Sequence, residues 1–96
     1  MSDKLDKALL SSSPKLAPGF RMQFEPAQQG YVLLYPEGMV QLNDPATEIL
    51  SRCDGATRLD RIVRDLELSF EEDDLSADVL EFVQTARDQG WLDCES

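Results

Sequence analysis

Three short segments in the first half of the chain show the residue pattern of β-strands. Residues 20–25 (FRMQFE) alternate apolar with polar side chains, the period of a strand with one buried face. Residues 31–35 (YVLLY) are apolar on both faces, which is typical of a central strand. Residues 39–42 (MVQL) are half apolar and follow the turn signal at residues 36–38 (PEG), so we predict a hairpin. If the three strands pair in chain order, the returning strand lies at the sheet edge.

Three segments in the second half carry apolar residues at helical spacing. Asp44 before a proline, Thr57 and Ser76 are predicted as their N-caps. Gly55 and Gly90 are expected to end the first and third helices. The predicted buried faces are Ala46, Ile49, Leu50 and Cys53 in the first helix, Leu59, Ile62, Val63, Leu66 and Phe70 in the second, and Leu75, Val79, Phe82, Val83 and Ala86 in the third. We therefore predict an α+β fold similar to winged helix-turn-helix domains, a three-stranded antiparallel sheet followed by three helices.

The two ends of the chain have weaker patterns. Residues 1–14 show no sustained period and end in Ser-Ser-Ser-Pro, so we predict a mobile N-terminal arm, or at best a frayed helix around residues 5–10. Residues 15–96 are predicted to form a single domain, because a chain of 96 residues that is 42% hydrophobic has room for one core. Near the C-terminus, Trp91 and Leu92 are expected to pack back onto that domain.

Negative charge is concentrated in the second half of the chain. Nineteen acidic and nine basic residues give a net charge of -10, and residues 1–43 contain four of each sign, so the whole excess lies in residues 44–96. Such a surface is a poor partner for nucleic acid or an anionic membrane. The run at residues 71–74 (EEDD) lacks the ordered ligand pattern of a calcium loop and is expected to be solvated. Without a signal peptide or an apolar stretch of about 20 residues, a cytoplasmic location is expected.

The residue types argue against catalysis by this chain. It has no histidine, the usual neutral-pH base and the commonest metal ligand. Its glycines form no phosphate-binding motif, and the two cysteines are too far apart in sequence for a CxxC pair. Cys53 is expected to be a buried thiol and Cys94 an exposed one. We therefore predict neither catalytic residues nor a metal or cofactor.

With catalysis excluded, the sequence indicates a binding module, and its partner could be DNA or another protein. The fold order resembles DNA-binding regulators, and Arg52, Arg58, Arg61 and Arg64 cluster around the second predicted helix. These arginines alternate with aspartates, which fits an ion-paired surface or a protein-docking patch better than a DNA interface. On the third helix, Leu80 lies beside the apolar face, where an apolar side chain marks either a contact surface or an ordinary exposed leucine.

Three blocks of sequence, LLYPEGMVQLN, ATEILSRCDG and DVLEFVQTARDQGWL, resemble the PqqD family of pyrroloquinoline quinone (PQQ) biosynthesis. The resemblance extends from about Pro14 to Leu92. It implies a non-enzymatic recognition element for ribosomal peptide modification, which binds the precursor peptide PqqA and presents it to PqqE. In that family PqqE is a radical S-adenosylmethionine (SAM) enzyme that crosslinks a glutamate and a tyrosine of the peptide.

The resemblance also implies where the peptide binds. In the family the peptide is added as a strand beside the third strand, in the cleft formed with the third helix, which agrees with the open edge predicted above. The matching positions here are Val40, Gln41, Leu42, Val79, Leu80, Val83, Gln84 and Arg87. Val40, Leu42, Val79 and Val83 could equally be core residues. An affinity of about -8 to -10 kcal/mol would suit delivery followed by release. Both a monomer and a homodimer remain open.

Overall fold

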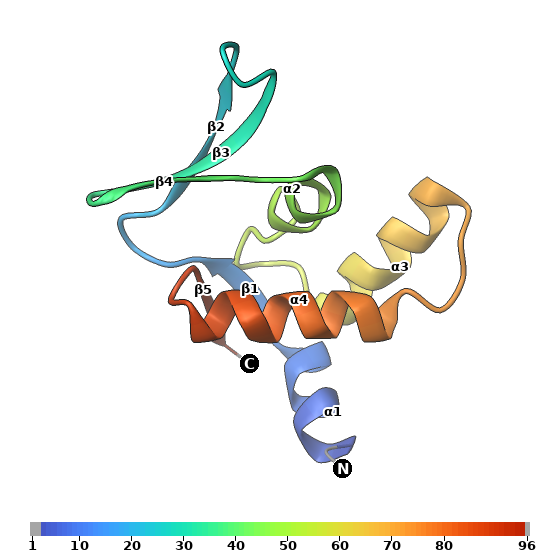
Figure 1. Ribbon diagram of the computed structural model, residues 1–96. Helices are drawn as coiled ribbons and strands as arrows, with labels where there is room; N and C mark the ends of the chain where they lie inside the picture. The colour runs from blue at the N-terminus through green and yellow to red at the C-terminus, as the bar shows by residue number, and fades with distance from the viewer. Residues whose placement is uncertain (1–2, 96) are drawn as a thin grey trace.

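The structure is a computed structural model in which residues 3–95 are described. Its helices are α1 (Asp3–Ser11), α2 (Asp44–Leu50), α3 (Leu59–Phe70) and α4 (Ser76–Asp88). Its strands are β1 (Ser13–Leu16), β2 (Arg21–Glu25), β3 (Gly30–Tyr35), β4 (Gly38–Gln41) and β5 (Leu92–Glu95). Figure 1 shows the β2-β3-β4 sheet on one side of the helices and α1 on the other. The predicted class, an α+β fold with a three-stranded antiparallel sheet followed by three helices, is confirmed.

The three-stranded sheet has the predicted order, with β3 in the centre and β4 at an edge. Val32 and Leu33, on opposite faces of β3, are both fully buried, as expected for a central strand that is apolar on both faces. Tyr35 pairs with Gly38 across the turn, so the hairpin forms where the sequence PEG predicted it. The face of Leu33 includes Met22 and Leu42, and these two side chains pack against the helical core.

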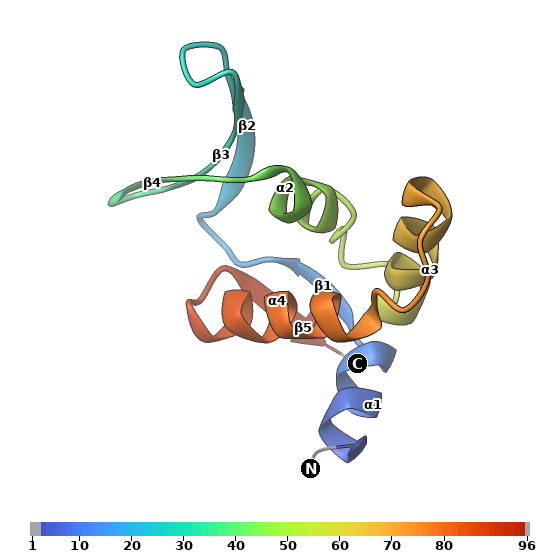
Figure 2. The ribbon, with the colours of Figure 1, turned by 45° about the vertical axis from the view of Figure 1, so that its right-hand side comes forward.

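The far end of the β2-β3 hairpin differs from the prediction. Phe24 was expected on the buried face of its strand, but this residue is 51% exposed. Tyr31, its partner on β3, is 41% exposed. The two rings contact each other edge to face, with centroids 5.4 Å apart. Figures 1 and 2 show the reason, because this end of the hairpin projects beyond the helices and no helix covers it.

The helical core follows the predicted apolar stripes closely. It consists of one cluster that takes Ile49, Leu50 and Cys53 from the α2 region, Leu59, Ile62, Val63 and Leu66 from α3, and Val79, Val83 and Ala86 from α4. Leu9 and Leu92 complete it. Phe70, which was predicted to extend the α3 stripe, is instead 46% exposed. It is the last residue of α3.

All three predicted N-caps are off by one residue. Asn43 caps α2, because its side-chain oxygen accepts a hydrogen bond from the Ala46 N–H at 2.9 Å. Arg58 and Leu75 stand at the N-cap positions of α3 and α4 without a side-chain cap. Thr57, predicted to cap α3, instead donates its hydroxyl to Asp54 at 3.1 Å.

The N-terminal segment, expected as an arm before residue 15, contains a helix and a strand. Leu9 of α1 is 4% exposed and belongs to the core cluster. The backbone oxygen of Ser12 accepts from the Leu59 N–H at 2.8 Å, and that of Pro14 accepts from the Gly55 N–H at 3.0 Å. Tertiary contacts therefore hold this segment against the domain in the structure, although its own sequence pattern is weak. Its mobility in solution stays a prediction.

The structure also contains a second, two-stranded sheet that the sequence pattern did not predict. β1 pairs with β5 antiparallel, with Leu16 opposite Leu92 and Pro14 opposite Cys94. The Trp91 carbonyl accepts from the Ala17 N–H at 2.8 Å, and Leu92 is 2% exposed. The expectation that Trp91 and Leu92 pack back onto the domain is therefore confirmed, and they do so at the start of a strand.

Candidate functional site

The outer edge of β4 is defined by the hydrogen bonds on its inner side. The Leu42 N–H donates to the Tyr31 carbonyl oxygen at 3.0 Å, and Val40 lies opposite Leu33 in the same register. In an antiparallel pair, hydrogen-bonded positions alternate with positions whose backbone groups point outward. Val40 and Leu42 therefore pair with β3, while Met39 and Gln41 direct their N–H and C=O groups away from the sheet.

The side chains of this strand differ in exposure. Val40 is half-buried, and Leu42 is half-buried against the helical core. Gln41 is exposed, and its side-chain amide donates to the side-chain oxygen of Gln28 in the β2-β3 loop. Because side chains alternate along a strand, that of Gln41 lies on the opposite face of the sheet from Leu42, which packs against the helical core.

The α4 positions separate into core and surface. Val79 and Val83 are 3% and 0% exposed, which makes them core residues in the free protein. Leu80 is half-buried and packs against the same core cluster as Leu42. Gln84 is half-buried, and Arg87 is exposed in the last turn. Leu80, Gln84 and Arg87, spaced at four and then three residues, lie on one side of the helix.

β4 and α4 lie on the same side of the molecule. Figures 1 and 2 show both running across the view, with β4 above and α4 below, and with opposite chain directions. Leu42, just after β4, and Leu80, on α4, share one core, so the relative position of the two elements is set by packing. The predicted site residues thus fall on two neighbouring elements. Which of them contact a peptide stays a prediction.

An apolar cavity that the sequence did not suggest lies near the point where β4 leads into α2. It has a volume of about 440 Å³ and is bounded by α2, α3 and the first turn of α4. Ile49, Leu66 and Leu75 are among its apolar lining residues, and Asp44, Glu48, Glu72 and Asp78 are its acidic ones. Val79 is the one predicted site residue among those that line it. Phe70, which also lines it, was predicted to be buried and is 46% exposed.

The described side chains show no arrangement suited to group transfer. Among the side chains that the structure describes, those of residues 7–94, no three from cysteine, aspartate or glutamate gather as a metal-binding group. Burial raises the pKa of the Cys53 thiol to about 12, with smaller contributions from Cys94 and Asp54, and the thiol donates to the Ile49 carbonyl at 3.2 Å. Cys53 is therefore held as an unreactive thiol. Cys94 is half-buried rather than exposed as expected, and its burial also raises its pKa.

The fold and this edge define a class of protein, a small α+β binding domain that offers an open strand beside a helix. The helices within the described part of the chain are too short and too polar to cross a membrane. Residues 30–92 match the family model described as coenzyme PQQ synthesis protein D (PqqD). The chain belongs to the PqqD family.

Curated relatives support this assignment over almost the whole chain. A protein of Azotobacter vinelandii named PqqA binding protein is 47% identical over 90 residues, which are 93% of this chain and 98% of the relative. A protein of Methylococcus capsulatus with the same name is 46% identical over 78 residues, 81% of this chain and 84% of the relative.

A solved structure shows the same fold. It is the solution NMR structure of the PqqD truncation of Methylobacterium extorquens PqqCD, described as a functional and stand-alone recognition element for ribosomally synthesized and post-translationally modified peptides. The TM-score is 0.71 at 26% identity, over 91% of this chain and 98% of that one. The likeness therefore includes nearly all of the described elements.

Proposed function

We propose that this protein binds the precursor peptide PqqA as an additional strand on β4. The observation that carries the proposal is the open edge, where the backbone groups of Met39 and Gln41 point outward beside α4. An extended peptide that pairs with these groups gains affinity from main-chain hydrogen bonds, while neighbouring side chains select its sequence. The relatives named PqqA binding protein support the choice of this peptide.

Side chains beside the edge provide the selectivity. Leu80 offers an apolar contact, and Arg87 is exposed where it can pair with a peptide carboxylate. Val40, Gln41, Leu42 and Gln84 complete the contact surface, and Val79 and Val83 shape it from beneath. The apolar cavity next to Val79 adds space for a large apolar side chain of the peptide.

The protein itself acts as a chaperone and adaptor rather than as an enzyme. We infer that it presents PqqA to the radical SAM enzyme PqqE, in the cytoplasm, and that the crosslinking chemistry belongs to that enzyme. An affinity of about -8 to -10 kcal/mol, a micromolar or somewhat tighter complex, holds the peptide for delivery and still allows its release.

Calorimetric titration with PqqA tests the binding step. The proposal predicts saturable binding at micromolar concentrations, and a folded sample that shows no heat change at about 100 times that concentration would overturn it. A second measurement tests presentation: PqqE should form the crosslinked peptide faster when this protein is present at concentrations that saturate the peptide. An unchanged rate would mean that the protein binds PqqA without presenting it.

A further inference from the structure

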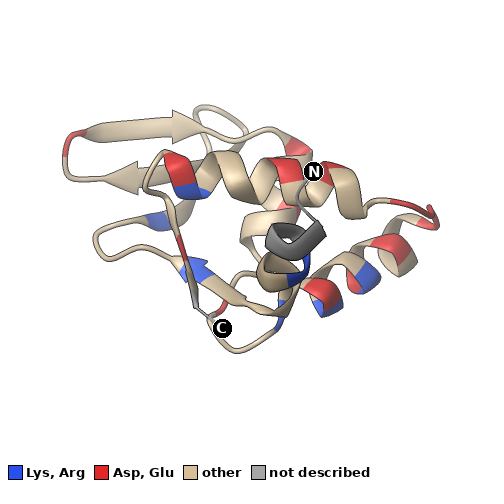
Figure 3. Cartoon of the chain, turned by 90° about the horizontal axis from the view of Figure 1, so that it is seen from below, with Lys and Arg blue, Asp and Glu red and all other residues tan. Residues whose placement is uncertain are grey.

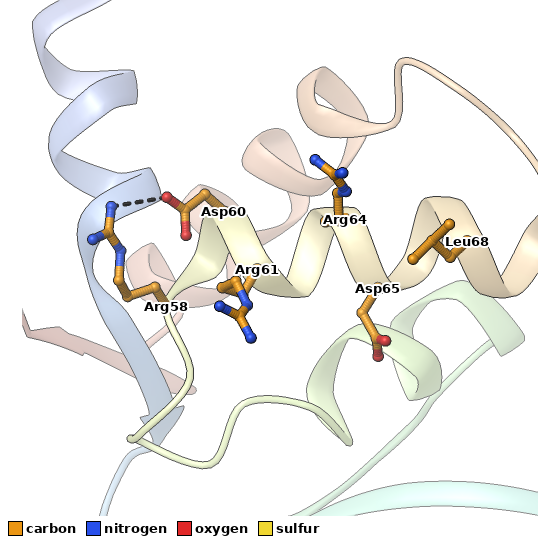
Figure 4. A pocket seen from close by; sticks show the side chains of 6 residues that line it. All are labelled: Arg58, Asp60, Arg61, Arg64, Asp65 and Leu68. Atoms are coloured by element: carbon orange, nitrogen blue, oxygen red, sulfur yellow. Dashed lines mark hydrogen bonds and ion pairs between the residues drawn. The ribbon is translucent and has the colours of Figure 1, made fainter.

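The outer face of α3 has a composition unlike the rest of this acidic molecule. A shallow depression of about 710 Å³ runs along it and is lined by Arg58, Asp60, Arg61, Arg64, Asp65 and Leu68. Figure 4 shows these side chains along the helix, from Arg58 before its first turn to Leu68 near its end. Three of the nine basic residues of the chain therefore line one depression.

Ion pairs neutralise only part of this positive charge. Arg58 is paired with Asp60 at 2.8 Å, and Asp65 accepts from Arg52 at 2.9 Å. Arg61 and Arg64 are exposed and form no ion pair with any side chain that the structure describes. The hydrogen bonds of Arg52, to Glu48 first and then to Asp65, raise the pKa of its guanidinium and fix it between α2 and α3. Arg61 and Arg64 are the cations left available to a partner.

Leu68 extends this pair into a stripe. Arg61, Arg64 and Leu68 stand at positions i, i+3 and i+7, so they share one face of the helix over about 11 Å. Leu68 is 70% exposed, the most exposed of the large hydrophobic side chains of the described chain. Arginine beside an exposed apolar side chain is the composition that protein-protein interfaces favour.

We propose that the stripe Arg61-Arg64-Leu68 is the docking surface for an acidic segment of the enzyme that receives the peptide, an inference that rests on the proposed function. The segment would present two carboxylates to Arg61 and Arg64 and an apolar side chain to Leu68. The stripe belongs to α3, whereas the proposed peptide contacts belong to β4 and α4, so peptide and enzyme can bind at the same time.

The surrounding charge selects against other occupants. A second copy of this chain carries a net charge of -10 and is repelled at long range. A nucleic acid would extend past the end of α3 into the acidic residues 71–74, which Figure 3 shows as a red segment after that helix. A short acidic protein segment can contact the stripe without reaching residues 71–74. The carboxylates around the stripe select against wrong partners.

The test compares two charge-reversal variants of the full chain. Arg61→Glu/Arg64→Glu changes the stripe, and Lys7→Glu/Arg21→Glu makes the same change in net charge at exposed positions on α1 and β2. Binding of each to purified PqqE is measured at low and high salt, and binding of each to PqqA is measured in parallel. The stripe variant should lose about tenfold or more in affinity for PqqE at low salt and retain its affinity for PqqA. The control should retain both.

Each other outcome is informative. Equal PqqE affinity of the two variants would overturn the docking surface, as would a wild-type protein that binds PqqA but not PqqE. Failure to bind PqqA would count against the proposed function and not against the stripe. Leu68→Ala, which leaves all charges in place, should also weaken PqqE binding. Tight low-salt binding of a DNA duplex that the stripe variant loses would replace the enzyme with nucleic acid as the occupant and contradict the proposal.

Discussion

The Leu42 N–H donates to the Tyr31 carbonyl oxygen at 3.0 Å, and this bond determines which backbone groups of β4 face outward. Because hydrogen-bonded pairs alternate along an antiparallel ladder, it places the N–H groups of Met39 and Gln41 on the free edge. The proposed function depends on this alternation more than on any one side chain, since main-chain pairing is what an added strand uses.

Gln41→Pro tests the edge directly, because it removes one outward N–H and leaves the inner ladder intact. Proline is tolerated on an edge strand whose N–H faces solvent, so the protein should stay folded. Affinity for PqqA should fall about fivefold or more. Gln41→Ala is the matched control, since it also loses the bond to Gln28 but keeps the N–H. If both variants bind the peptide equally well, the Gln41 N–H plays no part in binding.

Leu80→Asp tests the helix side of the site. Leu80 is half-buried, so the substitution should cost only about 1 kcal/mol of unfolding free energy, measured by urea denaturation. Peptide affinity should fall by a larger factor, because an apolar contact is replaced by a charge. Leu68→Asp on α3 is the control and should leave PqqA binding unchanged. A parallel loss of stability and affinity in Leu80→Asp would show that Leu80 is a core residue.

Leu9→Ala tests whether the N-terminal helix contributes to the fold. Leu9 is 4% exposed, so truncating it should lower the free energy of unfolding by about 2 to 4 kcal/mol. Lys7→Ala, at an exposed position on the same helix, should change it little. A mobile arm would give no difference between the two variants, and it would show fast amide exchange throughout residues 3–11.

The buried thiol of Cys53 predicts a pH dependence. Its pKa is raised to about 12 in the folded protein, against about 8.5 for a free thiol, so the folded state favours the protonated form. The stability that comes from keeping the Cys53 thiol protonated in the folded state is fully present below a pH of about 8.5 and is lost as the pH rises toward 12. Cys53→Ala should reduce the decline in this range, measured by denaturation at stepped pH. Rapid alkylation of Cys53 at pH 8 would contradict its buried state.

The sequence predicted the sheet and three helices because their periodic patterns are also their burial patterns. Residues 31–35 and the stripes of α3 and α4 are examples, since packing there agrees with local preference. β1 could not be predicted in this way, because Ser-Pro-Lys-Leu has few β-forming residues and is a strand through its pairing with β5. The predicted cap at Thr57 was wrong for a similar reason, since a contact outside the helix competes for its side chain. The Thr57 hydroxyl donates to Asp54, whose carboxylate also accepts the Ala56 and Thr57 N–H groups.

The candidate site was predictable in outline only. An edge strand follows from the order of three strands, so the open side of β4 was expected from the hairpin. The sequence did not predict which residues of β4 point their backbone groups outward. The pairing register, and not the residue type, assigns that role to Met39 and Gln41. The cavity beside Val79 combines residues of three helices, and no local pattern in the sequence brings such residues together.

Amide hydrogen exchange on β4, with and without PqqA, tests the central claim most directly. In the free protein the Met39 and Gln41 N–H groups should exchange fast, and the Val40 N–H, paired with β3, should be protected. Saturating PqqA should slow exchange at Met39 and Gln41 markedly, because their N–H groups then donate to the peptide backbone. Saturable binding of PqqA that leaves both amides exchanging at their free rates would contradict the addition of the peptide as a strand on β4.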